Sequence, residues 1–291
     1  MTNSRHMRLI ADGGSTKVHW VLYDGERHSI DLFTPGMNPA TMSAETLLSI
    51  LRKHLVPQLQ HPQLIGKVEY YGAGCRGEAC SAMRCAIVNA LPHATDITVE
   101  SDMLGACRAM SEGESAIVCI LGTGANSCLY DGEKIIDNVP PLGYLLGDEG
   151  SGAWLGKTLV ADILKKMLPE DLTNEFHRLY PYGYDELIRR IYRPTADDIA
   201  PNRFLASFAP FLSAHISHTY IKEIVTRGFN LFFDRNIMLY YNRYPLLSPQ
   251  LLPLKFTGSI AAYFSEQLRD VAKDRNLPEP YIRRAPLGKP L

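Results

Sequence analysis

An internal repeat is the feature that most constrains how this chain can fold. An apolar segment, a glycine-rich turn, a second apolar segment and the tripeptide Tyr-Asp-Gly follow one another twice, with the tripeptides at residues 23–25 and 130–132. One shared tripeptide could arise by chance, but the same position after the same kind of turn indicates two related subdomains. We therefore expect two domains built on one plan.

The apolar pattern predicts strands and helices in both copies. Short apolar runs bounded by turn residues predict strands at residues 8–11, 18–23, 30–33, 68–71, 97–99, 116–121, 127–130, 134–136 and 255–257. Longer patterns with helical spacing predict helices at residues 43–56, 78–91, 154–167, 185–192, 204–216, 221–240 and 261–276. Strands that alternate with helices after an antiparallel start are typical of an α/β fold.

The composition favours a small ligand over a polymer or a membrane. The chain has 291 residues, 46% of them hydrophobic, so two packed cores are affordable. Its 30 basic and 31 acidic residues nearly cancel, which provides no charged surface for nucleic acid or an anionic membrane. No apolar stretch is long enough to span a bilayer or act as an export signal, so we expect a cytoplasmic protein.

The six cysteines do not indicate a metal site. They contain no Cys-x-x-Cys pair, which argues against a zinc ribbon or a thioredoxin-type motif. We expect reduced thiols in the core or on helix surfaces.

Three glycine-rich turns, at residues 12–17, 122–126 and 257–259, are candidates for holding a nucleotide. Glycine lets the backbone approach phosphate oxygens without a Cβ clash, and successive N–H groups and hydroxyls can donate to them. Asp12 adds a carboxylate able to hold a hydrated Mg²⁺. The alternative is that these are only tight turns. The first two turns occupy equivalent positions in the repeat, which favours phosphate binding. The candidate phosphate-binding residues are Asp12, Gly13, Gly14, Ser15, Thr16, Lys17, Gly122, Thr123 and Gly124.

A segment that resembles a P-loop ends at Gly156-Lys157-Thr158. The first glycine of a P-loop would fall at position 151, which is Ser151, and no apolar strand precedes it. We interpret Lys157 and Thr158 as early residues of a helix.

Five motifs occur in a fixed order: DGGSTK, ESDMLGA, LGTGANS, GDEGSGAWLG and FTGSIAAY. In this order they resemble the N-acetylglucosamine kinases within the BadF/BadG/BcrA/BcrD-type ATPases. The resemblance implies the actin-like ATPase fold, in which two ribonuclease-H-like domains, each with a mixed five-stranded sheet, enclose ATP, Mg²⁺ and a sugar in an interdomain cleft. It also implies that Gly258 and Ser259 belong to the adenosine loop.

The resemblance implies roles for single residues, and the residues themselves leave alternatives open. Asp102 matches the catalytic base, whereas an aspartate between a strand and a helix could equally be a helix N-cap. Asn38 matches a sugar contact, and its alternative is a turn asparagine before Pro39. Asp148 matches another sugar contact, and its alternative is a cap for the following helix. The substrate-binding candidates are Asn38, Ala125, Asn126, Gly143, Asp148 and Glu149.

The expected domains are residues 1–112, with the sugar and first phosphate loop, and residues 113–277, with the second phosphate loop and the adenosine loop. Residues 278–291 are expected to return toward the first domain. This tail contains four prolines, so no helix can cross it and the closing element of the family is absent or altered.

The function expected from these observations is ATP-dependent phosphorylation of an amino sugar, N-acetylglucosamine or glucosamine. One alternative is an ATPase that activates a redox enzyme, and another is a non-catalytic sugar-binding homologue. The partner is a small-molecule sugar, with no nucleic acid and no membrane. The oligomeric state stays open, a homodimer included.

Overall fold

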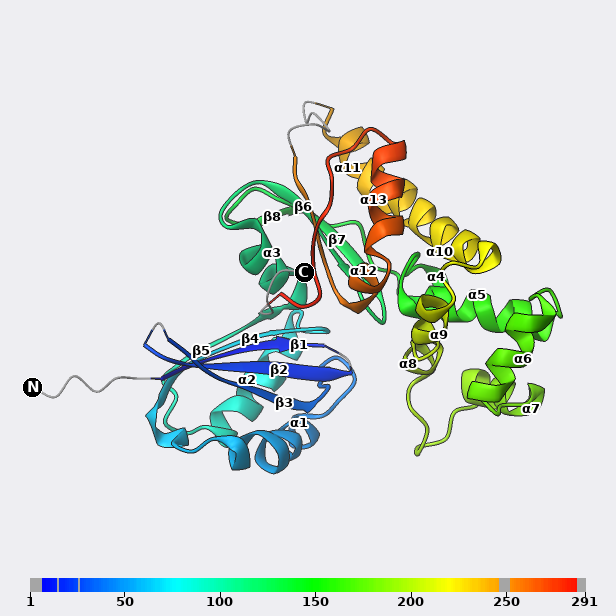
Figure 1. Ribbon diagram of the computed structural model, residues 1–291. Coiled ribbons are helices and arrows are strands. Elements are labelled where there is room, and N and C mark those ends of the chain that lie inside the picture. Colours follow the sequence, from blue (N-terminus) through cyan, green and yellow to red (C-terminus); the bar gives the residue numbers. More distant parts are fainter. Residues whose placement is uncertain (1–6, 15, 26, 246–251, 287–291) are drawn as a thin grey trace, which may run out of the picture. The chain divides into compact units, whose positions relative to one another are not determined.

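The computed structural model describes residues 7–14, 16–25, 27–245 and 252–286 (Figure 1). The chain divides into two compact units, Met1–Met110 and Ser111–Leu291. Each unit contains one five-stranded sheet, so the predicted α/β fold with two mixed five-stranded sheets is confirmed.

The sheet of the first unit has the strand order β3-β2-β1-β4-β5. Strands β1 and β2, and β2 and β3, pair antiparallel, whereas β4 runs parallel to both β1 and β5. The strands are β1 (Met7–Gly13), β2 (Lys17–Asp24), β3 (Arg27–Pro35), β4 (Ile65–Gly72) and β5 (Asp96–Ser101). The parallel strands β1, β4 and β5 therefore end at the same edge of this sheet.

Helices α1 (Ala44–Ile50) and α2 (Glu78–Ala90) cover one face of this sheet, and α3 (Asp102–Ser111) follows β5 directly (Figure 1). The predicted helix at residues 43–56 is α-helical only as far as Ile50. It continues as a π-helical turn, Leu51–Leu55, and two short 3₁₀ turns follow at Val56–Gln58 and Pro62–Leu64. Pro57, within Val56–Gln58, has no amide hydrogen and cannot continue an α-helix.

The sheet of the second unit has the order β10-β9-β6-β7-β8 and repeats the plan of the first. Its central strand β6 pairs antiparallel with β7, which pairs antiparallel with β8, whereas β9 runs parallel to both β6 and β10. The strands are β6 (Ala116–Leu121), β7 (Ala125–Tyr130), β8 (Ile135–Asp137), β9 (Leu254–Thr257) and β10 (Tyr281–Arg283). Gly25 and Gly132 occupy the same turn of the two copies, both with positive φ, so the sequence repeat is a structural repeat.

The first part of the tail forms a strand of the second sheet. β10 is an edge strand of that sheet, with Ile282 opposite Phe256. The expectation that residues 278–291 return toward the first domain stays a prediction. Pro278 and Pro280 keep the chain extended after the last helix. Ile282 is buried in the core of the second unit, which stabilises the strand there.

The second unit is richer in helix than the first. Its helices are α4 (Gly143–Leu146), α5 (Gly152–Leu164), α6 (Glu170–Leu179), α7 (Tyr184–Tyr192), α8 (Pro201–Ala206), α9 (Ala209–Ala214), α10 (Thr219–Phe232), α11 (Met238–Arg243), α12 (Ser259–Tyr263) and α13 (Ser265–Asp274). A π-helical turn, Phe233–Ile237, joins α10 to α11. None of the helices in the described ranges is both long and apolar enough to span a membrane.

Two predicted helices are each two helices in the structure. The segment at residues 204–216 breaks into α8 and α9 because Pro210 begins a new helix. The segment at residues 261–276 breaks at Phe264, whose φ of −119° is not helical. Helix α6 was not predicted, because Pro169 ends the preceding pattern but also stands at the N-cap of α6.

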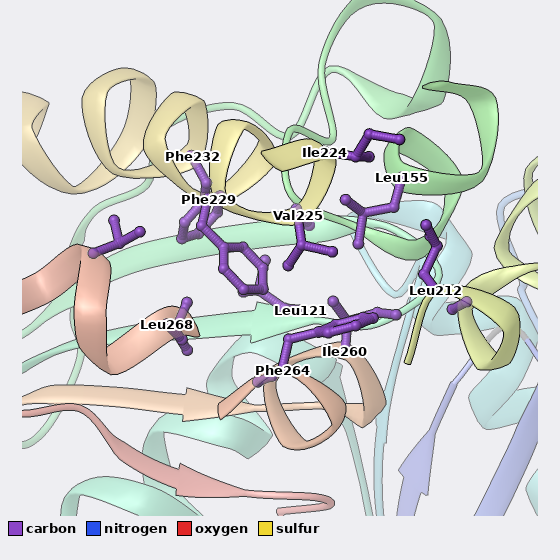
Figure 2. Close-up of a cluster of buried hydrophobic side chains, with 14 of the residues drawn as sticks. Leu121, Leu155, Leu212, Ile224, Val225, Phe229, Phe232, Ile260, Phe264 and Leu268 are labelled. Atoms are coloured by element: carbon purple, nitrogen blue, oxygen red, sulfur yellow. The ribbon is translucent and has the colours of Figure 1, made fainter. Parts of the chain in front are cut away.

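The core of the second unit forms where side chains from β6, α5, α9, α10, α12 and α13 meet (Figure 2). Leu121, Phe229 and Phe264 are fully buried in it, and each contributes about 1.5–3 kcal/mol to the stability of the unit. Gly156 shows how closely α5 and α8 approach, because a Cβ there would lie 1.9 Å from the carbonyl oxygen of Leu205. The interpretation of Lys157 and Thr158 as helical residues is confirmed, since both lie in α5.

Candidate functional site

In the first unit the candidate site lies where three parallel strands end. Gly13 at the end of β1 is opposite Gly72 of β4, and Gly72 is opposite Ser101 of β5. Asp12 and Asp102 each adjoin this row in sequence, so both carboxylates belong to the same edge of the sheet. The carboxyl edge of parallel strands is where α/β proteins bind ligands.

Asp102 is not the N-cap of α3. Ser101 has that role, since its Oγ accepts a hydrogen bond from the backbone N–H of Leu104 at 3.2 Å. Oδ1 of Asp102 accepts the N–H of Met103 at 2.9 Å, which leaves Oδ2 without a hydrogen bond from a described residue. Burial raises the pKa of Asp102, and the backbone N–H of Met103 and the charge of Arg76 lower it.

Asp12 carries a strongly perturbed carboxyl group. Burial and the neighbouring charge of Asp102 raise its pKa from 3.8 to about 7, and the charge of Lys17 lowers it. Both aspartate side chains are only half-buried, so solvent still reaches them. Two carboxylates that are surrounded mostly by protein and repel each other favour a bound cation or a proton.

The turn after Asp12 is tight, and its glycines have different roles. The N–H of Gly14 donates to the carbonyl of Lys17 at 3.0 Å, which closes the turn. A Cβ on Gly13 would lie 2.5 Å from the hydroxyl of the buried Tyr70, so this glycine is required by packing. Thr16 and Lys17 are exposed beside the turn, whereas Ser15 lies outside the described residues.

Asn38 has the turn geometry that the sequence allowed. Its Oδ1 accepts the N–H of Ala40 at 3.0 Å, and its backbone carbonyl accepts the N–H groups of Thr41 and Met42. A Cβ added to Gly74 would lie only 1.9 Å from the same Oδ1. Asn38 therefore packs closely against the loop after β4. Its Nδ2 donates to no residue in the described ranges. A turn role and a ligand contact through Nδ2 are therefore compatible.

The loop at residues 73–77 was missed by the sequence analysis. The N–H of Ala73 donates to the carbonyl of Gly13 at 2.8 Å, and Gly74 and Gly77 have positive φ values of 80° and 54°. The loop thus contacts Asn38 and the first turn, and the charge of its Arg76 acts on Asp102. The glycine pattern of residues 72, 74 and 77 was the signal that could have revealed it.

In the second unit, the turn at residues 122–124 connects β6 to β7 and is held by α5. The N–H of Gly152 donates to the carbonyl of Gly122 at 2.8 Å, and that of Ala153 donates to the carbonyl of Thr123 at 3.0 Å. A Cβ on Gly122 would meet nothing within 4 Å, so space is open beside it. The turn is therefore fixed by α5, with open space beside Gly122.

Asp148 is bonded to the same turn. Its Oδ1 accepts the N–H of Ala125 at 3.2 Å, and a Cβ on Gly124 would lie 3.0 Å from its Oδ2. Burial raises the pKa of Asp148, and this N–H and the charge of Lys157 lower it. The alternative that Asp148 caps the following helix is wrong, because Oγ of Ser151 caps α5 by accepting the N–H of Trp154 at 3.1 Å.

A pocket of about 400 Å³ opens in the second unit beside Asp148. Of the predicted substrate residues, it is lined by Ala125, Asp148 and Glu149. Glu149 is buried and forms an ion pair with Arg235 at 2.5 Å. Apolar residues complete the wall, which consists of Val139, Pro140, Pro141, Leu142 and Leu239 together with Gly147, Asp234 and Asn236.

Two predicted substrate residues of the second unit do not line this pocket. The side chain of Asn126 is hydrogen-bonded to neighbouring residues. Its Oδ1 accepts the N–H of Ser127 and an amide hydrogen of Asn138, both at 2.9 Å. Gly143 begins α4 with a φ of 76°. The π-helical turn that supplies Asp234, Arg235 and Asn236 was missed, because its sequence has ordinary helical spacing.

The predicted adenosine loop follows β9 at the carboxyl edge of the second sheet. Gly258 has a φ of 115°, and a Cβ there would lie 2.2 Å from the carbonyl oxygen of Leu121, so only glycine fits. Ser259 begins α12. The adjacent hydroxyl of Thr257 is buried and has no hydrogen-bond partner within the described ranges.

The structure resembles a solved protein across almost its whole length. A protein from Porphyromonas gingivalis, described as a candidate N-acetylglucosamine kinase, has 39% sequence identity and a TM-score of 0.89. The match covers 96% of this chain and 95% of that protein. The chain belongs to this N-acetylglucosamine kinase-like family of sugar kinases.

Two further solved structures share the fold of this family. A candidate N-acetylglucosamine kinase from Chromobacterium violaceum has 16% identity and a TM-score of 0.70, over 97% of this chain and 96% of that one. A glucokinase of the ROK family from Streptomyces griseus, solved with glucose and AMPPNP, has 12% identity and a TM-score of 0.51, over 97% and 94%. No protein-family model and no curated protein matches the sequence.

Proposed function

We propose that this protein transfers the γ-phosphoryl group of ATP to a hydroxyl of an amino sugar, with N-acetylglucosamine as first choice. The observation that carries the proposal is the position of Asp102. It lies at the carboxyl edge of the first sheet together with Asp12, and Ser101 leaves it free of helix capping. The 39% identity to a candidate N-acetylglucosamine kinase supports the choice of acceptor.

Asp102 acts as the general base in this proposal. It accepts the proton of the attacking sugar hydroxyl while a bond forms between that oxygen and the γ-phosphorus, and the bond from phosphorus to the ADP oxygen breaks. General base catalysis of this kind contributes about 10²- to 10⁴-fold in rate. Alignment and charge neutralisation supply most of the remainder.

The residues present fit ATP and Mg²⁺. Asp12 would hold Mg²⁺ through water, because its raised pKa shows a carboxylate that a cation would stabilise. The turns at residues 13–17 and 122–124 would contact phosphate oxygens, and the open space beside Gly122 admits them. The hydroxyl of Thr257, which has no hydrogen-bond partner among the described residues, lies next to Gly258 and Ser259, the proposed adenosine contacts. Mg²⁺ neutralises charge on the phosphates when it is bound.

The proposed acceptor residues of the second unit are centred on Asp148. Its carboxylate can accept hydrogen bonds from sugar hydroxyls, and the pocket beside it is large enough for a monosaccharide. Ala125, Asn126, Gly143 and Glu149 complete the set of this unit. In the first unit the proposed contact is Nδ2 of Asn38. A cytoplasmic location is part of the proposal, because the donor is ATP.

An ADP-release assay tests the function. N-Acetylglucosamine, glucosamine, N-acetylmannosamine and glucose are compared at equal concentration with Mg-ATP, and the phosphorylated product is identified by mass spectrometry. We expect the highest kcat/KM with N-acetylglucosamine. The proposal fails if folded protein releases no more ADP with any of these sugars than without sugar.

A further inference from the structure

The loop at residues 73–77 contacts two of the proposed components of the first unit, the turn after Asp12 and Asn38. Its first residue, Ala73, donates its N–H to the carbonyl of Gly13, next to the proposed Mg²⁺ ligand. Its second residue, Gly74, packs against the side chain of Asn38. Because β4 lies between β1 and β5, this loop stands between Asp12 and Asp102 at the edge of the sheet.

Arg76 is the cationic residue of this loop, and its side chain forms no hydrogen bond or ion pair with the described residues. The backbone is fixed, since the N–H of Arg76 donates to the carbonyl of Gly74 at 3.0 Å and its carbonyl accepts the N–H of Ala79 at 3.2 Å. The guanidinium is exposed and has neither an ion pair nor a hydrogen bond with any residue in the described ranges. Its charge nevertheless reaches Asp102, whose pKa it lowers against the effect of burial.

The charges at this edge are balanced before the reaction and change during it. The charge of Lys17 acts on Asp12, and that of Arg76 acts on Asp102. When Asp102 takes the proton of the acceptor hydroxyl, its negative charge disappears. The positive charge of Arg76 then has no carboxylate partner at the place where the phosphoryl group arrives. A cation beside a phosphoryl group in transfer stabilises the charge of the transition state and is a strong source of rate enhancement.

We propose that Arg76 is a further catalytic residue, which contacts the phosphoryl group while it passes to the acceptor. The inference rests on the proposed kinase function and adds the loop after β4 to its machinery. A guanidinium suits this role, because its planar fork can donate two hydrogen bonds to phosphate oxygens and it stays charged at any working pH.

The experiment compares three variants in the same ADP-release assay. Arg76→Gln keeps most of the side-chain length but removes the charge, and Arg76→Lys restores a charge without the fork. Arg52→Gln is the matched control, because Arg52 is an exposed arginine of the same unit whose guanidinium donates to Asn89 on the helical side. Thermal melting establishes that each variant is folded.

We expect Arg76→Gln to lower kcat by about 100-fold or more, with KM values for sugar and ATP changed less than about threefold. The kcat of Arg76→Lys should be at least about tenfold higher than that of Arg76→Gln. The kcat of Arg52→Gln should equal that of the wild type. The inference is overturned if Arg76→Gln retains wild-type kcat, or if its whole effect is on KM. A wild-type protein without sugar-dependent ADP release would overturn the proposed function as well, so the two failures are distinguishable.

Discussion

At the scale of single residues, two serines cap the helices that two nearby aspartates could have capped. Ser101 caps α3 beside Asp102, and Ser151 caps α5 three residues after Asp148. In both places the sequence alone left the aspartate as a candidate cap, because aspartate and serine cap helices about equally well. Hydrogen-bond geometry, which no sequence pattern shows, separates the capping residue from the candidate functional one.

The first prediction compares the members of one such pair. Asp102→Asn should lower kcat by about 10²- to 10⁴-fold because the base is lost, with sugar and nucleotide binding retained. Ser101→Ala should lower the free energy of unfolding by about 1 kcal/mol and leave kcat nearly unchanged. Steady-state kinetics and urea denaturation measure the two effects. A Ser101→Ala protein as stable as the wild type would show that Ser101 is not the cap of α3.

The second prediction concerns pH and Asp12. The pKa of Asp12 is about 7 in the folded protein and 3.8 as its ordinary value, so the folded state binds more protons between pH 4 and pH 7. The free energy of unfolding therefore falls as pH rises through this window, and the loss is complete above pH 7. Asp12→Asn cannot ionise and escapes this loss.

Without nucleotide or Mg²⁺, we expect Asp12→Asn to be more stable than the wild type at pH 8 by about 1–2 kcal/mol. This figure is below what the full shift would give, because solvent reaches the half-buried carboxylate. At pH 4 the two proteins should be equally stable. Urea denaturation at both pH values measures the difference, and a difference that does not change with pH would contradict the prediction.

At the scale of elements, the sequence predicted the strands better than the helix ends. Strands of this chain are short apolar runs bounded by turn residues, so the predicted strand at residues 116–121 coincides with β6. Helix breaks depend on single residues inside a continuous apolar pattern. Pro210 separates α8 from α9, yet the apolar residues on both sides keep helical spacing.

The candidate site shows the same limit. The glycine-rich turns could be predicted from the sequence, because clustered glycines indicate a tight turn or a close approach of the backbone to a ligand. The loop at residues 73–77 and the π-helical turn at Phe233–Ile237 were not, because each gains its place only from the packing of distant residues. The strand β10 was not predicted for a third reason, since nothing local shows which sheet an edge strand will join.

The third prediction tests the crossing of α5 and α8. Alanine normally stabilises a helix by about 1 kcal/mol relative to glycine. Here the added Cβ would lie 1.9 Å from the carbonyl oxygen of Leu205, so Gly156→Ala must push the helices apart. We expect the free energy of unfolding to fall by about 2–4 kcal/mol.

Gly183→Ala is the control for this variant. A Cβ on Gly183 would meet nothing within 4 Å, and we expect a change of less than about 1 kcal/mol. Urea denaturation of both variants measures the effects. A Gly156→Ala protein as stable as the wild type would mean that the two helices do not pack so closely.

At the scale of the whole molecule, each unit has its own hydrophobic cluster. The cluster of the first unit includes Trp20, Leu47 and Tyr70, and that of the second includes Leu121, Phe229 and Ile282. The two clusters share no residue. Each copy of the repeat therefore contains its own sheet and its own hydrophobic core.

The fourth prediction places the tail in the second of these cores. Ile282→Ala should lower the free energy of unfolding of the second unit by about 2–4 kcal/mol, because Ile282 is 4% exposed. Ile136→Ala is the control, since Ile136 lies in the strand at the other edge of the same sheet and is 42% exposed. Denaturation followed by tyrosine fluorescence measures both. Equal effects would place the tail elsewhere.

Two separate cores also affect how such a chain can change over generations. A substitution that weakens one core is compensated among the residues of that core, since the other contains none of its partners. The edge with the paired carboxylates and the edge with the Asp148 pocket can therefore accumulate mutations independently.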